Sequence, residues 1–220
     1  MTQGVPKTLL EVNGKTIIQT IIENACAVNI KKFIVIIGYQ HKYIMSSIKK
    51  LRLEVEIEFV YNSNWKKANG ISVLLSKPYL KYGEPFMISM GDHIYGEDLF
   101  SKVFRADLDK FEAIVGLDFR VDQVFDIDDA MKVIVEKDNP TRLTSMSKDL
   151  SVYDAIDCGV FKCNYQFFNV LEKLNNKKDF SLSDACRYLI KHGSMGGIDI
   201  KNSFWMDIDT PESFNELINY

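Results

Sequence analysis

Apolar and polar residues alternate along the first 120 residues in a pattern of repeated strands and helices. Residues 33–38 form a continuous apolar run rich in β-branched side chains, as expected of a strand that is buried on both faces. Residues 17–28 carry apolar side chains at helical spacing. The same reasoning predicts further strands over 55–61, 85–90 and 112–117, and further helices over 41–51, 71–76 and 99–104. Strands separated by helices predict an α/β fold with a doubly wound, mostly parallel sheet.

The pattern changes after residue 130. Two short runs, 131–136 and 141–147, flank the turn signal Lys137-Asp138-Asn139-Pro140 and predict a hairpin. We expect the remaining strands over 155–163, 195–200 and 204–206, and helices over 167–174, 182–191 and 211–218. No repeat, low-complexity tract or linker divides the chain, so we expect residues 1–220 to form a single domain.

Composition narrows the class of protein. The hydrophobic fraction of 46% is that of an ordinary globular domain, and the net charge of −3 argues against a general nucleic-acid binder. The four cysteines have no metal-binding spacing, and we interpret them as reduced, mostly buried thiols: Cys26, Cys158, Cys163 and Cys186. No apolar run approaches the roughly 20 residues of a membrane span, and residues 1–7 lack the apolar core of a signal peptide. We therefore expect a cytoplasmic protein.

Asp92 is the first candidate for chemistry. It follows the apolar run 85–90 and so lies at the carboxyl end of a predicted strand, where open α/β sheets bind their ligands. A metal ligand is one interpretation, because Mg²⁺ is held by one or two carboxylates together with substrate phosphates. The alternative is that Asp92 caps the helix near Asp98 or satisfies turn amides. His93 is expected to be a turn residue rather than a metal ligand, since imidazole is a poor partner for Mg²⁺, and contact with an acceptor substrate is its alternative role.

A second acidic pair lies near the end of the chain. Asp207 and Asp209 are two residues apart, so their side chains share one face of an extended segment. Asp209 precedes Thr210 and Pro211, which predict a helix start, and helix capping is the alternative role for Asp209. Asp207 has no evident capping role. We therefore predict that Asp92 and Asp207 converge at one edge of the sheet to hold a divalent metal.

Other candidates each have an ordinary structural alternative. Lys7, positioned by Pro6, is either a surface lysine or a phosphate ligand. The segment Asn69-Gly70-Ile71-Ser72 lies at a predicted helix start, where backbone amides bind phosphate or a base edge, but Ser72 is equally suited to cap the helix. Gly159, in Asp157-Cys158-Gly159, either lets a ligand approach the backbone or marks a β-bulge.

These motifs together resemble the sugar-phosphate-type nucleotidyltransferase family, and most of all its CTP:inositol-1-phosphate cytidylyltransferases. The resemblance covers essentially the whole chain and rests on five segments in family order: Pro6-Lys7-x-Leu9, Asn69-Gly70 with Ser72, Met90-Gly91-Asp92-His93-x-Tyr95, Asp157-Cys158-Gly159 and Trp205-x-Asp207-x-Asp209-Thr210. The resemblance implies a Rossmann-like fold of the nucleotide-diphospho-sugar transferase type.

The resemblance also implies an activity and roles for the candidate residues. The expected substrates are a nucleoside triphosphate and a phosphorylated alcohol or sugar such as an inositol phosphate. The resemblance implies CTP as the triphosphate, while the sequence itself does not fix the base. The acceptor phosphate attacks the α-phosphorus and pyrophosphate leaves. By the family pattern Asp92 and Asp207 hold Mg²⁺ and Lys7 neutralises phosphate charge. The nucleoside is expected near Asn69, Gly70 and Ser72, and the acceptor near Asp157, Gly159 and Asp209.

One departure from the family pattern concerns the start of the chain. Family members open with a strand and a glycine-rich loop that cradles the triphosphate, whereas Met1-Thr2-Gln3-Gly4 begins where that loop ends. We expect the 220 residues to be a shortened form with weak or no catalysis. Two alternatives to the transferase remain at this point. One is a catalytically silent nucleotide-binding relative, and the other is a metal-dependent glycosyltransferase that uses Asp207-Ile208-Asp209 as its Asp-x-Asp motif.

Overall fold

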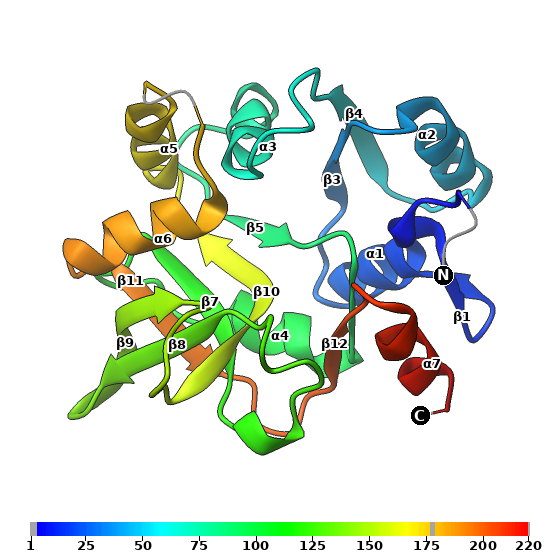
Figure 1. The fold of residues 1–220 in the computed structure, drawn as a ribbon. Coiled ribbons are helices and arrows are strands. Elements are labelled where there is room, and N and C mark those ends of the chain that lie inside the picture. The colour runs from blue at the N-terminus through cyan, green and yellow to red at the C-terminus, as the bar shows by residue number, and fades with distance from the viewer. Residues whose placement is uncertain (1–3, 177–178, 220) are drawn as a thin grey trace.

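The computed structural model describes residues 4–176 and 179–219 (Figure 1). Its first half contains the short 3₁₀ helix η1 (Lys7–Leu9), the hairpin of β1 (Glu11–Val12) and β2 (Lys15–Thr16), then α1 (Ile17–Ala27), β3 (Lys32–Ile37), α2 (His41–Lys50), β4 (Glu56–Tyr61) and α3 (Gly70–Leu75). After the 3₁₀ helix η2 (Lys77–Tyr79) come β5 (Phe86–Ser89), β6 (His93–Tyr95), α4 (Glu97–Arg105) and β7 (Ala113–Asp118). Most of these bounds agree with the predicted elements to within two residues.

The second half begins with η3 (Val121–Gln123) and the predicted hairpin, which is formed by β8 (Lys132–Glu136) and β9 (Asn139–Ser147). The long strand β10 (Ala155–Cys163) leads into α5 (Phe167–Asn175) and α6 (Leu182–Lys191). The strands β11 (Met195–Asp199) and β12 (Trp205–Asp207) and the helix α7 (Pro211–Asn219) complete the described chain.

The strands form a mixed sheet rather than the mostly parallel one that the sequence suggested. Six strands pair in the order β5-β10-β7-β11-β9-β8, and β10 also pairs with β8. Among the described pairings only β3–β4 and β7–β11 are parallel. The local alternation of strand and helix carries no information on pairing direction, and β10 lies antiparallel between β5 and β7. The α/β class is confirmed, whereas the mostly parallel sheet is wrong for this part of the chain.

Side-chain caps fix several helix starts. Thr16 accepts a hydrogen bond from the backbone N–H of Gln19 at the start of α1. Ser181 and Asp184 form a reciprocal capping box at the start of α6. Thr210 accepts from the backbone N–H of Ser213 at 3.0 Å in the first turn of α7, which is the capping role that the sequence predicted. Such caps satisfy amide groups that have no partner within the helix.

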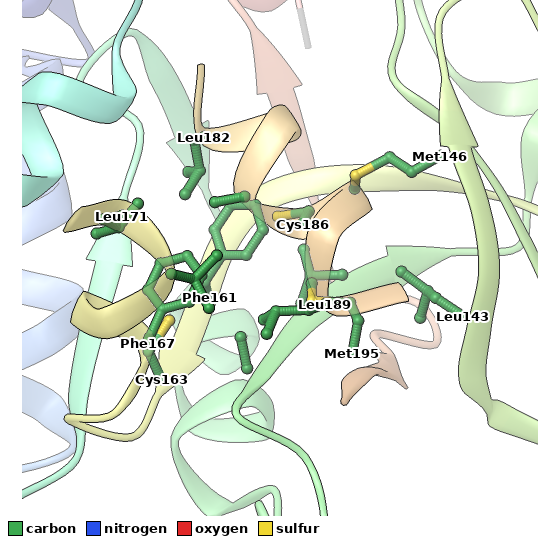
Figure 2. Close-up of a cluster of buried hydrophobic side chains, with 14 of the residues drawn as sticks. Leu143, Met146, Phe161, Cys163, Phe167, Leu171, Leu182, Cys186, Leu189 and Met195 are labelled. Atoms are coloured by element: carbon green, nitrogen blue, oxygen red, sulfur yellow. The ribbon is translucent and has the colours of Figure 1, made fainter. Parts of the chain in front are cut away.

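The largest core cluster fills the space between the six-stranded sheet and the helices α5 and α6. Figure 2 shows side chains of β10, α5 and α6 directed toward one another, among them Phe161, Phe167 and Leu189. All six residues of β7, the strand between β10 and β11, are buried. The four cysteines are unpaired, with Cys158, Cys163 and Cys186 buried as predicted. Among the described residues, no helix has both the length and the apolar character that crossing a membrane requires.

The strand β6 was not predicted. The sequence reading placed His93 in a turn, but residues 93–95 pair with β12 in a small antiparallel sheet. Three residues directly after a turn are too few to show a period, so nothing local announces the strand. This small sheet positions the two acidic segments described next.

Candidate metal centre

The antiparallel pair of β6 and β12 brings two distant acids together. Asp207 lies opposite His93 in the register of the two strands, and Asp92 immediately precedes His93. The backbone N–H of Ile208 donates to the carbonyl of Asp92 at 3.1 Å, which continues the pairing past the end of the strands. The carboxylates of Asp92 and Asp207 therefore lie side by side, although the residues are far apart in the sequence.

His93 lies between the two carboxylates. Its Nδ1 atom is 3.1 Å from Oδ1 of Asp92 and 3.3 Å from Oδ1 of Asp207. The imidazole is 12% exposed, whereas the two acid side chains are 42% and 39% exposed. The Trp205 ring stacks against it with centroids 6.0 Å apart and an interplanar angle of 26°. The histidine is thus a buried hydrogen-bonding partner of Asp92 and lies within ion-pair distance of Asp207, which its interpretation as a turn residue did not anticipate.

The three side chains shift one another's protonation. The pKa of Asp207 is raised to about 6, chiefly by burial and also by the nearby carboxylates of Asp92 and Asp209, against the opposing charge of His93. Burial also acts to raise the pKa of Asp92, but the hydrogen bond and positive charge of His93 outweigh it, so that pKa lies below its usual range. Burial acts to lower the pKa of His93, yet the Asp92 hydrogen bond and the surrounding acids raise it overall.

The donor set fits a hard divalent cation. One ligand atom from each of Asp92, His93 and Asp207 lies within 4.8 Å of the others. Oδ1 of Asp207 is shielded from solvent and accepts no hydrogen bond from the described residues, an unsatisfied state that a bound cation would relieve. Carboxylate oxygens are the protein ligands that Mg²⁺ prefers, while imidazole suits transition metals better. The group of Asp92, His93 and Asp207 could therefore hold a divalent cation, with the two carboxylates as its hard oxygen ligands.

These acids face a cavity of about 250 Å³. Asn69, Asp157, Gly159 and Asp209 also line it, so four further residues singled out from the sequence reach the same space. The lining also includes Lys148, which forms an ion pair with Asp129 at 2.7 Å, and the neighbouring residues Phe125, Asp126, Ala130 and Met131. The cavity combines several acids with apolar walls, as expected of a site for a polar small molecule with a bound cation.

Asp157 and Gly159 lie at an irregularity of β10. The register of β10 against β7 shifts between Asp157 and Phe161, and Gly159 has a φ of +76°. A Cβ atom on Gly159 would lie 2.8 Å from the His93 ring, so only glycine fits there. Burial raises the pKa of Asp157 to about 6, although its carboxylate accepts a hydrogen bond from the Gly159 amide at 2.7 Å. The segment is a bulge, which was one of the two alternatives from the sequence, and it also forms part of the cavity wall.

Lys7 pairs with Asp209. Its Nζ atom is 2.5 Å from Oδ1 of Asp209, and the two side chains are 37% and 41% exposed. Within the described part of the chain, the capping bond of α7 is accepted by Thr210 rather than by Asp209. The ion pair holds a cationic group at the rim of the cavity, next to the acid that lines it.

Residues 69–72 lie between two neighbouring cavities. Asn69 lines the cavity and accepts a hydrogen bond from the Leu182 amide at 2.8 Å. Gly70 packs against Phe180, whose ring a Cβ atom would approach to 2.5 Å. Ser72 accepts from the side-chain amide of Asn62 at 3.0 Å and lines a neighbouring groove rather than the cavity. The structure thus brings Asn69 to the acids but not Gly70 or Ser72.

The sequence did not predict the hydrogen bonds that hold the Trp205 indole in place. Its indole N–H donates to Oδ2 of the buried Asp118 at 2.9 Å, and Asp118 also binds the Arg120 guanidinium through both of its oxygens. Arg120 in turn donates to the Ser203 carbonyl at 2.8 Å. The sequence did offer one signal for this network. An acid and an arginine lie two residues apart at the end of the predicted strand 112–117.

Comparison with known proteins agrees with this arrangement. A family model described as nucleotidyl transferase matches residues 1–220. The chain is 29% identical over 225 residues to a bifunctional IPC transferase and DIPP synthase of Aquifex aeolicus, covering 100% of this chain and 48% of that protein. It is 28% identical over 220 residues to the bifunctional protein GlmU of Methanococcus maripaludis, covering 96% of this chain and 48% of the relative. The chain thus spans about half the length of these relatives.

Solved structures show the same fold. The inositol-1-phosphate CTP transferase from T. maritima superposes with a TM-score of 0.85 at 23% sequence identity. The match covers 100% of this chain and 88% of that one. The structure of HddC from Yersinia pseudotuberculosis complexed with GMP-PN superposes with a TM-score of 0.77 at 17% identity, covering 98% of this chain and 89% of that chain.

Proposed function

The chain belongs to the nucleotidyl transferase family, and we propose that it couples CTP to a phosphorylated alcohol of the inositol phosphate type, with release of pyrophosphate. The names of the relatives support this choice of substrates, since one is an IPC transferase and a structural neighbour is an inositol-1-phosphate CTP transferase. A sugar phosphate is the closest alternative acceptor, given the second group of relatives.

The convergence of Asp92 and Asp207 is the observation that carries the proposal. Both carboxylates face the cavity, and one oxygen of Asp207 lacks any hydrogen-bond partner within the described chain. In this proposal the two acids hold Mg²⁺, which supplies electrostatic stabilisation to the triphosphate when bound. Nucleotidyl transfer depends on such positioning and charge compensation more than on covalent catalysis.

The other candidate residues take roles according to their places around the cavity. Lys7, at the rim, compensates phosphate charge when its ion pair with Asp209 opens. Asn69 contacts the nucleoside, with Gly70 and Ser72 supporting the turn that presents it. Asp157, Gly159 and Asp209 border the acceptor. An anionic oxygen of the acceptor phosphate forms a bond to the α-phosphorus as the bond to the pyrophosphate oxygen breaks. No general base is needed, because the attacking oxygen is already deprotonated.

A substrate matrix tests the proposal. Pyrophosphate release is measured for four nucleoside triphosphates against inositol phosphate, phosphocholine and glucose 1-phosphate, with and without Mg²⁺. We expect the signal to be largest with CTP and inositol phosphate, and to fall at least about 100-fold in Asp92→Asn and Asp207→Asn. Asp199→Asn is the matched control, since Asp199 pairs with Lys201 and does not line the cavity.

Titration with Mn²⁺ and CTP provides a second measurement that does not require turnover. Nucleotide binding that both acid variants weaken, without pyrophosphate release from any substrate pair, would replace the transferase with a silent nucleotide-binding protein. Release of a nucleoside diphosphate from a nucleotide sugar would indicate a glycosyltransferase instead. Full metal affinity in either acid variant would remove that residue from the metal site.

A further inference from the structure

A cluster of aromatic side chains is exposed where β3 and β4 end and α2 begins. Among the described residues, it contains four large exposed rings: Tyr39 (59%), Tyr43 (49%), Tyr61 (52%) and Trp65 (40%). The Tyr39 and Trp65 rings lie 5.4 Å apart, and the His41 ring lies 4.5 Å from that of Tyr61. Figure 1 shows α2 beside these strands at the upper right of the molecule. Single exposed aromatic residues are ordinary, but a cluster of them indicates an interaction surface.

The same surface carries five exposed lysines: Lys42, Lys49, Lys50, Lys66 and Lys67. Those of α2 share one face of the helix with Tyr43, at helical spacing, while Ile44 and Ile48 pack into the core. The Lys66 Nζ atom lies 5.4 Å from the centre of the Trp65 ring. None of the five lysines forms an ion pair with an acid of the described chain. We call the five lysines and the four rings the α2 patch.

Acidic side chains are missing from the segments that form the α2 patch, although the whole chain has a net charge of −3. Residues 24–53 and 59–83 contain no aspartate or glutamate. Glu56 and Glu58 of β4 alternate with residues that pack toward α2, so these two acids belong to the opposite face of the sheet. Asp179, which accepts a hydrogen bond from the Ala68 amide at 3.0 Å, marks one edge of the patch. The patch is therefore a positive surface on an acidic protein, and its charge complements an anionic partner.

The combination of side chains favours a lipid surface as that partner. Tyrosine and tryptophan are enriched at the headgroup level of membranes, and clusters of roughly four to eight basic residues on an amphipathic helix are typical of binding to anionic lipids. Protein interfaces share the aromatic enrichment but are depleted in lysine. Single-stranded nucleic acid binds along a positively charged groove. None of residues 38–67 lines the cavity of the candidate metal centre or its neighbouring groove.

We propose that the α2 patch docks the protein on the surface of a bilayer that contains anionic lipids. The lysines lie against the headgroups, and the rings of Tyr39, Tyr43 and Trp65 enter the headgroup layer. The patch shares no residue with the cavity that Asp92 and Asp207 face. The docking is therefore separate from the nucleotidyl transfer proposed above and does not depend on it.

Vesicle sedimentation tests this docking with two triple variants. The patch variant carries Lys42→Gln, Lys49→Gln and Lys50→Gln. The matched control carries Lys110→Gln, Lys137→Gln and Lys191→Gln, which remove the same charge from exposed lysines outside the patch. The vesicles consist of phosphatidylcholine alone or of equal parts phosphatidylcholine and phosphatidylglycerol.

We expect the parent protein to bind the anionic vesicles, and more weakly as the salt concentration rises. The patch variant should bind them about 100-fold more weakly, because each lysine near such a surface contributes about fivefold. The control variant should bind within about twofold of the parent, since its substitutions lie away from the bilayer. Equal binding by the two variants, or parent binding that is as tight on phosphatidylcholine alone, would overturn docking through the α2 patch.

Tryptophan fluorescence reports which face meets the bilayer. Lipids with brominated acyl chains quench an indole that enters the membrane interface, and Trp65 and Trp205 are the two tryptophans of the chain. We expect quenching in the parent and in Asp207→Asn but not in Trp65→Phe, which keeps an aromatic ring in place. Quenching that persists in Trp65→Phe would overturn the orientation that the proposal requires.

Two further measurements on the same variants examine other partners. Binding to a single-stranded oligonucleotide is followed by fluorescence anisotropy, and self-association by sedimentation velocity. We expect neither to differ between the patch variant and its control. Oligonucleotide binding that only the patch variant loses, without vesicle binding by the parent, would replace the lipid surface with nucleic acid. Self-association lost in the same way would replace it with a second copy of this chain.

Discussion

Asp207 lies directly opposite His93 in the pair of β12 and β6, with Oδ1 of the acid 3.3 Å from Nδ1 of the imidazole. The same nitrogen lies 3.1 Å from Asp92. One histidine neighbours both acids, so when it is protonated its positive charge compensates the two carboxylates as a bound cation would. Metal binding and protonation therefore compete at this site.

Metal affinity should depend on pH through Asp207. Burial raises the pKa of this carboxyl to about 6, so it is protonated below that pH and must lose a proton before it binds a cation. We expect Mn²⁺ affinity, measured by electron paramagnetic resonance, to fall up to about tenfold per pH unit below pH 6. Asp207→Asn should bind weakly with a flatter profile. Affinity that is equal at pH 5 and pH 7 would contradict this coupling.

Lys7 should matter for triphosphate binding and little for stability. An exposed ion pair such as Lys7–Asp209 contributes about 1 kcal/mol or less to folding. Lys7→Met should therefore leave the Tm nearly unchanged but weaken CTP binding about tenfold or more, because charge-assisted bonds to phosphate are stronger than neutral ones. Lys15→Met, which removes the ion pair with Glu23, is the matched control. Equal CTP affinity in the two variants would exclude Lys7 from the site.

Gly159 should tolerate no side chain, because a Cβ atom there would meet the His93 ring. Gly83 serves as a control for backbone strain alone. Gly159 and Gly83 have φ values of +76° and +80°, but only at Gly159 does a Cβ atom meet neighbours, with the His93 ring at 2.8 Å. Gly83→Ala should cost about 1–2 kcal/mol of unfolding free energy from strain alone. Gly159→Ala should cost about 1–3 kcal/mol more from overpacking and should also reduce Mn²⁺ affinity. Urea unfolding measures the loss of unfolding free energy in each variant. Equal losses in the two variants would show that the His93 ring moves aside without cost.

The sequence predicted the elements of this fold better than their pairing. Helices 17–28 and 41–51 and the hairpin after residue 130 were found because apolar period and turn chemistry are local signals. The antiparallel insertion of β10 was missed, since pairing direction depends on contacts between distant segments. The short strand β6 was missed for want of a measurable period.

The candidate site, too, was predicted only in part from the sequence. Asp92 and Asp207 were recognised because acids after apolar strands are conspicuous, and the structure brings them together. The bridging role of His93 and the bond from Trp205 to Asp118 depend on the pairing of β6 with β12. Nothing adjacent in the sequence of either residue announces that pairing. Positions of individual acids were therefore accessible from sequence, but the network that orients them was not.

Asp157 should lower the stability of the folded protein at neutral pH. Burial raises its pKa to about 6 from an ordinary value of 3.8, so the folded state binds the proton more tightly than the unfolded state. The stabilising protonated form is lost as the pH rises from about 4 through 6. Asp157→Asn keeps an acceptor for the Gly159 amide, now 2.7 Å from the carboxylate, and removes the charge. Its unfolding free energy relative to the parent should rise by up to about 3 kcal/mol between pH 4 and pH 7 and then level off. Urea titrations across this range measure the difference.

Asp157→Ala, which loses the acceptor as well, should have an unfolding free energy about 1–3 kcal/mol below that of the Asn variant at every pH. A difference between parent and Asn variant that does not change with pH would show that Asp157 keeps an ordinary pKa in the folded protein.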